Sequence, residues 1–405
     1  MTIHTHYQVI IVGGGTAGLT VAAQLHKKDR SLDIAIVEPS QDHYYQPAWT
    51  LVGAGTYDMA ATKKRTADYI PKGVTWIMNR VDTIEGGDSR VTLDTGQSMT
   101  YDYLVVAPGI QIDWDKITGL SEAIGQGGVC SNYGHDKAEY TWECVKRLKP
   151  GDKAFFTQPD TPIKCGGAPQ KIMWLTADYL RGRGLLDKVH VEMMSPGTKL
   201  FGVDVFRKAL EKVQARYGTA WSHYTKLVEI RGEKNEAVFD LIDKETGEVS
   251  GQRVEHYDMI HVVPPQSAPD FIKKSDVAGP GGWVDVDKNT LQHNRFKNVF
   301  SLGDAAGTPN AKTGAAVRKQ APVLVANLLR VMKEDKVTDD KRYHGYTSCP
   351  LTTGYGEMLL AEFDYDNNPD PSLPIDTTKP RKSMWILKKY ILPFMYWHGM
   401  LRGRA

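Results

Sequence analysis

The chain has 405 residues, with 50 basic and 48 acidic side chains, 41% hydrophobic residues and 24% charged residues. This length predicts two or three domains, and the ordinary hydrophobic and charged fractions exclude intrinsic disorder. Four cysteines are too few for a disulfide scaffold, so each is judged singly. The near balance of charge argues against a nucleic-acid-binding protein, and no nucleic-acid partner is expected.

The first predicted elements are a strand, a glycine-rich turn and a helix. Residues 7–12 are a short apolar run, residues 13–18 read Gly-Gly-Gly-Thr-Ala-Gly, and a helical apolar pattern follows. A second apolar run, at residues 34–37, ends at Glu38. This order is typical of a dinucleotide fingerprint, in which amides at the helix N-terminus meet phosphate and the acidic residue binds ribose. The predicted contacts are Gly13, Gly15, Thr16, Ala17, Gly18 and Glu38.

Two later strands end in small residues that suit the same dinucleotide. Residues 101–106 lead into Ala107, Pro108 and Gly109, and residues 298–302 lead into Gly303 and Asp304. These segments resemble the second and third flavin motifs of the two-dinucleotide-domain flavoprotein disulfide reductase superfamily. There the Gly-Asp carboxylate binds the ribityl or phosphate region of FAD. The resemblance implies a discontinuous FAD-binding domain, made of residues 1–110 and 285–330.

Residues 111–284 are expected to form a second Rossmann-like domain, whose first strand lies at residues 153–157. The loop after this strand, residues 158–169, holds three prolines and a lysine where a nucleotide needs free backbone amides. NAD(P) binding is therefore not expected there. The predicted fold class is α/β, with two Rossmann-like dinucleotide-binding domains and a C-terminal membrane-docking region over residues 331–405.

Two cysteines have unusual surroundings. Cys165 and Cys349 each lie among glycine and proline residues, as expected for loops that approach a ligand, whereas inert cysteines usually lie within apolar runs. Lys164 and Lys171 would favour a thiolate, which is the reactive form of cysteine. The residues alone leave two interpretations open, a redox pair and two inert thiols.

Five stretches carry a resemblance to a known family: HYYQPAWTLVGAG (43–55), TPIKCGGAPQK (161–171), PNAKTGAAV (309–317), YTSCPLTTGYG (346–356) and AEFDYD (361–366). They resemble the sulfide:quinone oxidoreductases, in particular the group that includes the mitochondrial enzyme. The resemblance implies FAD as cofactor, oxidation of sulfide to sulfane sulfur, and transfer of two electrons to a membrane quinone. Cys165 and Cys349 would be the catalytic pair, with the persulfide on Cys349 and the flavin-facing thiolate on Cys165.

The same resemblance adds two FAD contacts, Val81 and Lys312. The charge of Lys312 would stabilise the anionic reduced flavin, the alternative being a solvated lysine. Cys130 is a departure, because some distant members use a third cysteine in a comparable region and closer relatives do not need one. Cys144 lies in a predicted amphipathic helix and is interpreted as packing. No spacing of histidines and cysteines indicates a metal site, and the lone histidines His43, His256 and His261 are interpreted as structural.

The positive charge is concentrated at the C-terminus, because no acidic residue follows Asp376. Aromatic and aliphatic residues alternate with basic ones, and Pro393 is expected to divide the tail into two short helices. This composition suits an interfacial helix in the headgroup plane of a membrane, with a subunit interface or a core-capping helix as the alternative. The basic residues are Lys379, Arg381, Lys382, Lys388, Lys389, Arg402 and Arg404, and the apolar ones include Met384, Trp385, Ile386, Leu387, Ile391, Leu392, Phe394, Met395, Trp397, Met400 and Leu401.

The longest apolar run of the tail, residues 390–397, is too short to span a bilayer, and the N-terminus shows no signal peptide. The sequence therefore predicts a peripheral, monotopic protein, expected on a bacterial inner membrane. Two alternative activities stay open: an NADH:quinone oxidoreductase on the same fold, and the flavin subunit of a sulfide dehydrogenase that delivers electrons to a haem protein. A small sulfur acceptor and an oligomer are both compatible with the sequence, which specifies neither.

Overall fold

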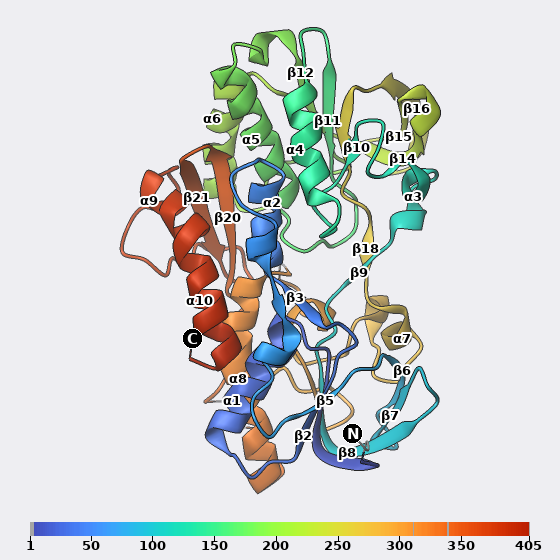
Figure 1. The fold of residues 1–405 in the computed structure, drawn as a ribbon, viewed down its shortest axis with the longest axis vertical. Helices are drawn as coiled ribbons and strands as arrows, with labels where there is room; N and C mark the ends of the chain where they lie inside the picture. The colour runs from blue at the N-terminus through green and yellow to red at the C-terminus, as the bar shows by residue number, and fades with distance from the viewer. Residues whose placement is uncertain (1–3, 311, 338–339, 405) are drawn as a thin grey trace.

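The computed structural model describes residues 4–310, 312–337 and 340–404. Two sheets with parallel strands lie at opposite ends of the molecule, as Figure 1 shows. The short antiparallel strands β9 (Gln111–Ile112) and β18 (Gln266–Ser267) run between these two ends. The fold is thus α/β with Rossmann-like parallel sheets, as the sequence predicts.

The first sheet has the strand order β5-β2-β1-β8-β7-β6, and β19 pairs in parallel with β8. The pairs among β5, β2, β1 and β8 are parallel, whereas β6 and β7 add an antiparallel edge. Helices cover both faces of such a sheet, which is why its inner strands are continuous apolar runs. The strands are β1 (His6–Val12), β2 (Ile34–Val37), β5 (Thr75–Ile77), β6 (Val81–Glu85), β7 (Arg90–Leu93), β8 (Ser98–Val106) and β19 (Val299–Ser301).

Two helices pack beside this sheet. Helix α1 (Thr16–Lys28) begins directly after the glycine-rich turn, and α8 (Gly314–Glu334) follows β19 along the chain. Leu19 and Leu25 of α1 share one core with Leu324 and Leu328 of α8. Because β19 and α8 come from the far side of residue 284, the first sheet and its core contain chain segments from both sides of the middle region.

The second sheet is parallel throughout, with the order β10-β17-β11-β12-β13. Helix α5 (Ala168–Gly182) connects β11 to β12, and α4 (Ala138–Arg147) and α6 (Asp204–Tyr217) accompany it. This strand–helix–strand arrangement is that of a Rossmann-like unit. The strands are β10 (Val129–Cys130), β11 (Lys153–Thr157), β12 (His190–Met194), β13 (Ala220–Ser222) and β17 (Met259–His261).

Smaller elements complete the two ends. An antiparallel sheet of β14 (Thr225–Arg231), β15 (Glu236–Ile242) and β16 (Val249–His256) stands beside the second sheet. The strands β3 (Asp42–Tyr44) and β4 (Lys63–Arg65) pair with one another, and β20 (Thr347–Gly354) forms a hairpin with β21 (Glu357–Phe363). The short helices are α2 (Trp49–Val52), α3 (Leu120–Ala123) and α7 (Asp270–Lys273).

Residues 270–277 pack against the first sheet, although they lie within the range predicted for the second domain. Ile272 and Val277 share a core with Ile84 of β6, and the Ser275 hydroxyl accepts a hydrogen bond from the Ile84 amide at 2.9 Å. The domain limits stay a prediction, and the packing shows that the chain returns to the first sheet before residue 284.

The C-terminal tail differs from the prediction in one respect. Helix α9 (Lys382–Ile386), a π-helical turn (Leu387–Ile391) and α10 (Leu392–His398) follow one another without a break, so Pro393 does not divide the tail. A π-helical turn widens the backbone locally, and here it directly precedes the turn that contains the proline ring. Figure 1 shows the resulting helix along the side of the molecule, next to the hairpin and α8.

The tail helix also buries residues that the prediction assigned to a membrane surface. Met384, Trp385, Trp397, Met400 and Leu401 are all buried, and the last three pack in the core of the first sheet. A second set remains exposed on the helix surface: Phe394 is 65% exposed, Tyr390 60%, Ile391 47% and Ile386 44%. The tail therefore caps a core on one side and presents an apolar face on the other.

Candidate active site

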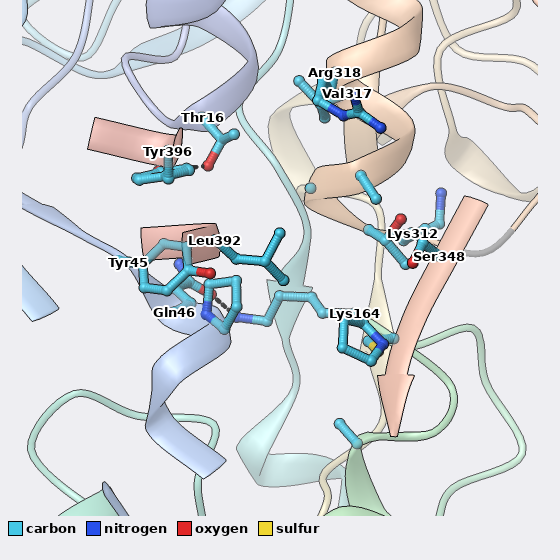
Figure 2. A pocket seen from close by; sticks show the side chains of 18 of the residues that line it. Thr16, Tyr45, Gln46, Lys164, Lys312, Val317, Arg318, Ser348, Leu392 and Tyr396 are labelled. Atoms are coloured by element: carbon cyan, nitrogen blue, oxygen red, sulfur yellow. Dashed lines mark hydrogen bonds between the residues drawn. The ribbon is translucent and has the colours of Figure 1, made fainter. Parts of the chain in front are cut away.

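A cavity of about 700 Å³ opens between the two ends of the molecule. Its wall combines the glycine-rich turn, the turns after β8 and β19, the loop before α5, the β20–β21 hairpin and the tail helix. Figure 2 shows side chains from these segments directed at one space, among them Thr16, Lys164, Ser348 and Leu392. Segments from the beginning, middle and end of the chain thus form a single site.

The glycine-rich turn requires its glycines for steric reasons. Gly13 has φ +98°, and a Cβ atom there would lie 2.5 Å from the Ala107 carbonyl oxygen. A Cβ atom on Gly18 would lie 1.8 Å from the Gly13 carbonyl oxygen, so α1 and β1 come too close for any side chain. Gly15, in contrast, faces open space in the cavity wall. The turn leaves room for a phosphate group at the N-terminus of α1.

Other predicted dinucleotide contacts lie in the expected places. Thr16, Ala17, Ala107, Pro108, Gly109 and Gly303 line the cavity. Glu38 accepts a hydrogen bond from the Gly14 amide at 2.7 Å and one from the Ser40 amide at 2.7 Å, so its carboxylate is held beside the turn. Val81 lies on β6 in the packed core of the first sheet and is not part of the cavity wall.

Asp304 and Lys312 are two ionisable residues that lie close together in the cavity wall. Burial raises the pKa of the Asp304 carboxyl, against the opposing charges of Lys312 and Lys164. The Lys312 ammonium donates to the backbone oxygens of Asp304 at 2.7 Å and Ala306 at 3.3 Å, and it lies 3.7 Å from the centre of the Trp283 ring. Lys312 is thus a buried residue that fixes the Gly-Asp turn, rather than a solvated one.

The fold brings the two predicted cysteines together. The Sγ atoms of Cys165 and Cys349 are 2.9 Å apart, although 184 residues separate them in the chain. Cys165 lies in the loop before α5, and Cys349 lies on β20, which packs against α5. Cys165 has φ +82°, a conformation that strains any residue with a side chain and is concentrated at functional sites.

Lys171, on the first turn of α5, distinguishes the two sulfurs. Its ammonium donates to Cys165 Sγ at 3.2 Å. The hydrogen bond from Cys349 and the charge of Lys171 hold the pKa of the Cys165 thiol well below its usual value, against the effect of burial. The pKa of Cys349 is raised by its hydrogen bond to Cys165 and by burial. The contact with Lys171 and these pKa directions favour the thiolate on Cys165 and the proton on Cys349.

Lys164, the other lysine expected to favour the thiolate, has contacts different from those of Lys171. The Lys164 ammonium donates to Gln46 Oε1 at 2.8 Å, as the dashed line in Figure 2 shows, and lies 5.9 Å from the ring centres of both Trp49 and Tyr133. No hydrogen bond joins it to Cys165 within the described ranges. Of the two lysines expected to favour the thiolate, Lys171 is therefore the one that contacts it.

The β20–β21 hairpin packs closely against the loop before α5. A Cβ atom on Gly167 would lie 2.2 Å from Leu351 Cδ2, because β20 packs against the N-terminal end of α5. In a nucleotide-binding Rossmann unit this helix terminus receives the pyrophosphate. The hairpin here occupies the approach to it, which agrees with the absence of a second glycine fingerprint in the sequence.

The other two cysteines lie in a packed core. Cys130 on β10 is fully buried, with its thiol 3.6 Å from the Ile260 carbonyl oxygen, and Cys144 of α4 belongs to the same apolar core. The structure therefore gives Cys130 no contact with the Cys165–Cys349 pair. Among residues 4–310, 312–337 and 340–404, no group of three or more His, Cys, Asp or Glu side chains is arranged to hold a metal ion.

The tail helix contributes side chains that the sequence did not single out. Tyr396 lies 2.8 Å from the Thr16 hydroxyl and 2.5 Å from His43 Nε2, and His43 Nδ1 lies 3.3 Å from the Gly14 carbonyl oxygen. Because a carbonyl only accepts, Nδ1 carries the proton, Tyr396 donates to Nε2, and Thr16 donates to Tyr396. This chain of hydrogen bonds fastens the tail to the glycine-rich turn.

Lys388, one of the basic residues of the tail, is also buried. It is 3% exposed, donates to the Pro47 carbonyl oxygen at 2.7 Å, and lines the cavity near the cysteine pair. A sequence signal existed: Lys388 lies four residues after Met384 and eight before Tyr396, on the buried side of the helix. Counting it with the surface charges of the tail was therefore wrong.

Comparison with known proteins first defines a broad class. Residues 7–140 match the family model described as pyridine nucleotide-disulphide oxidoreductase. This stretch contains the glycine-rich turn and the first sheet as far as β8. It agrees with a Rossmann-like fold that has a cysteine pair beside its dinucleotide cradle.

Full-length relatives narrow the class to a family. The chain is 47% identical over 399 residues to the mitochondrial sulfide:quinone oxidoreductase of Dictyostelium discoideum, covering 98% of this chain and 86% of the relative. It is 42% identical over 402 residues to that of Mus musculus, covering 99% and 88%. The chain belongs to the sulfide:quinone oxidoreductase family.

A solved structure supports the fold. The X-ray structure of the sulfide:quinone oxidoreductase from Aquifex aeolicus superposes with a TM-score of 0.81 at 19% identity, covering 99% of this chain and 92% of that one. At this identity the likeness concerns the fold alone. Within the part of the chain that the structure describes, no helix has the length and apolar character needed to cross a membrane.

Proposed function

We propose that this chain oxidises sulfide at the Cys165–Cys349 pair and passes two electrons through bound FAD to a quinone. The observation that carries the proposal is the 2.9 Å separation of the two sulfurs, because Cys165 lies in the wall of a cavity that also contains the glycine-rich turn, with Cys349 directly behind it. Membership of the sulfide:quinone oxidoreductase family supports both the reaction and the flavin.

The cradle around the glycine-rich turn fits FAD. Gly15 faces open space at the N-terminus of α1, where a pyrophosphate would meet backbone amides. Glu38 is held beside the turn for the ribose, and Asp304 offers a buried carboxylate for the ribityl hydroxyls. When bound, FAD accepts two electrons from the cysteine pair and delivers them to the quinone. Lys312 completes the proposed contacts, whereas Val81 is not proposed, because it lies in the packed core outside the cavity wall.

The chemistry of the pair is thiol–disulfide exchange. With the pair oxidised, hydrosulfide attacks Cys349 Sγ, a sulfur–sulfur bond forms there, and the Cys165–Cys349 bond breaks to leave Cys165 as a thiolate. The persulfide then passes its outer sulfur to a small acceptor, which leaves Cys349 as a second thiolate. Re-formation of the bond between Cys165 and Cys349 releases the two electrons to the flavin.

Lys171 explains why Cys165 leaves and Cys349 is attacked. A leaving sulfur departs faster when its thiol is more acidic, and Lys171 lies 3.2 Å from Cys165. Cys349 has no such hydrogen bond from a lysine in the described ranges, and burial keeps the pKa of its thiol high. The electrostatics thus match the assignment of persulfide to Cys349 and thiolate to Cys165.

The tail suits a peripheral contact with a membrane. Its exposed face carries Ile386, Tyr390, Ile391 and Phe394, while Leu387, Leu392 and Met395 line the cavity from the same helix. An apolar side chain that lies in the interface gives a helix its affinity for the bilayer, and a quinone would enter the cavity beside it. The names of the two relatives place those proteins in mitochondria, so the bacterial inner membrane expected from the sequence receives no support and is not proposed.

The decisive experiment is an anaerobic titration of the flavin spectrum with sulfide and then with quinone. We expect sulfide to bleach the flavin and quinone to restore it. Cys165→Ser and Cys349→Ser should each abolish bleaching, whereas Cys144→Ser, in the packed core, should retain it. Full bleaching in both catalytic variants would overturn the role of the pair.

The same anaerobic titration distinguishes this proposal from the two alternative activities. Rapid bleaching by NADH would favour an NADH:quinone oxidoreductase. Bleaching by sulfide without reoxidation by quinone would instead favour a flavin subunit that serves a haem protein.

Membrane contact has its own test, the co-sedimentation of the protein with lipid vesicles. Phe394→Glu should weaken sedimentation, because it places a charge on the exposed apolar face. Val249→Glu, at an exposed apolar residue of β16, makes the same change in charge outside the tail and is the control. Equal sedimentation of wild-type protein and Phe394→Glu would contradict docking through this face.

A further inference from the structure

Part of the cavity wall, which we call the apolar end, combines apolar side chains that pack together with a buried carboxylate. Leu360, Leu373, Leu387, Leu392 and Met395 line this end, and Glu362 of β21 lies in the same wall with 1% of its surface exposed. A buried carboxylate has to be paired or hydrogen-bonded, and one that is held by hydrogen bonds at a cavity wall is a candidate for a functional acid or base.

The contacts of Glu362 all come from uncharged donors. Oε1 accepts from the Tyr346 hydroxyl at 2.6 Å and from the Ser372 hydroxyl at 2.5 Å, and Oε2 accepts from the Ser372 amide at 3.2 Å. In the described ranges no lysine, arginine or histidine forms an ion pair with it. Arg318 and Lys319 of α8 lie near the Tyr346 ring instead, 5.9 Å and 5.4 Å from its centre. The carboxyl group is therefore held by hydrogen bonds from uncharged donors.

These contacts connect the cavity to the solvent. Ser372 lies in an exposed segment that also contains Asp370 and Pro371, and its hydroxyl touches the buried carboxylate directly. Glu362, Tyr346 and Ser372 all belong to the cavity wall. A proton can therefore pass from water at Ser372 to Glu362 and reach the apolar end of the cavity without crossing apolar side chains.

We propose that Glu362 delivers to the quinone a proton that its reduction takes from solvent. Quinone becomes quinol by gaining two electrons and two protons; FAD, when bound and reduced, would supply both electrons and one proton, so the second proton must come from water. A solvent proton moves through Ser372 onto Glu362, whose O–H bond then breaks as an O–H bond forms on the quinone. The carboxylate is restored for the next cycle. Tyr346 and Ser372 are positioning residues that hold it. The inference rests on the proposed function, because it places the quinone at the apolar end.

The test separates the two half-reactions by stopped-flow spectroscopy of the FAD-loaded enzyme. In Glu362→Gln we expect bleaching by sulfide within about two-fold of wild type and reoxidation by a short-chain quinone slower by roughly 100-fold or more. The solvent deuterium isotope effect on reoxidation should increase, which a merely structural change would not cause. Glu362→Asp should recover part of the rate.

Glu357 provides the matched control. It lies on the same strand, pairs with Arg216 and is not part of the cavity wall, so Glu357→Gln should leave both half-reactions unchanged. If Glu362→Gln fails to bind FAD, Ser372→Ala removes the exposed link and must itself slow reoxidation. If Glu362→Gln binds FAD and is reoxidised at the wild-type rate, the inference is overturned. If Ser372→Ala has to be tested in its place, reoxidation of that variant at the wild-type rate overturns it equally. A wild-type enzyme that bleaches with sulfide and is never reoxidised by quinone would overturn the proposed function instead.

Discussion

Replacing Lys388 by methionine should stabilise the protein. The Lys388 side chain is almost fully buried in the tail helix, and burial, together with the charge of Lys171, lowers its pKa from 10.5 to about 7, against the attraction of Cys165 and Cys349. Methionine has a similar length and no charge, so it fills the same space without the cost of a buried ammonium.

The magnitude follows from the pKa. A fall from 10.5 to about 7, at 1.36 kcal/mol per pKa unit, means that protonated Lys388 lowers the free energy of unfolding by roughly 5 kcal/mol. The unfolded chain holds the proton up to pH about 10.5, whereas the folded chain loses it above pH about 7. The full penalty is therefore present below pH 7 and disappears as the pH rises toward 10.5. With an unfolding entropy of about 2.1 cal/mol/K per residue, this energy corresponds to about 6 °C in Tm.

The assay is thermal unfolding of the FAD-loaded protein at several pH values between 6 and 10. The Tm of Lys388→Met should exceed that of wild type by several degrees at pH 6 to 7, and the difference should shrink as the pH rises. Lys382→Met is the control, because Lys382 is exposed on the same helix and its loss should change Tm little. A lower Tm in Lys388→Met at pH 6 to 7, or a difference that does not depend on pH, would refute the reasoning.

Two further predictions concern the cysteine pair and the cofactor cradle. Lys171→Met removes the cation 3.2 Å from Cys165, so the pKa of that thiol should rise, and alkylation of the reduced protein should require a higher pH; an unchanged pH profile would contradict the role of Lys171. Tyr396→Phe leaves the buried His43 Nε2 without a donor, which costs about 1–3 kcal/mol, and should lower both Tm and the affinity for FAD, measured by reconstitution of the apoprotein. The exposed Tyr390→Phe should change neither quantity, and equal FAD affinity in wild type and Tyr396→Phe would show that the tail does not secure the turn.

Local sequence patterns predicted those features of the fold and the site that depend on residues close together in the chain. Gly18 is required by the Gly13 carbonyl oxygen, five residues away, so this spacing is visible in the chain, whereas Gly13 is also required by Ala107 at the end of a distant strand. The strand and helix periods likewise predicted the α/β class, and three prolines after β11 predicted a loop unsuited to a nucleotide. These signals are short in range and therefore visible in the chain itself.

The resemblance to a family supplied what those patterns left open. Cys165 and Cys349 could be read from their surroundings as a redox pair or as inert thiols. The family motifs favoured the pair, and the separation of their sulfurs in the folded chain agrees with it. The assignment of roles within the pair stays a prediction, which the position of Lys171 supports.

The sequence by itself determined the dinucleotide cradle, the α/β class and the chemical character of the candidate residues. Only the tertiary structure decided which charged side chains are buried and which side of the tail helix is exposed to solvent. Lys388 and Phe394 lie six residues apart on one helix, and packing against the body buries the first and leaves the second exposed. Glu362 likewise became a candidate only when β21 placed it in the cavity wall. The physical reason is that composition counts charges, whereas burial and pairing depend on which distant segments pack against each of them.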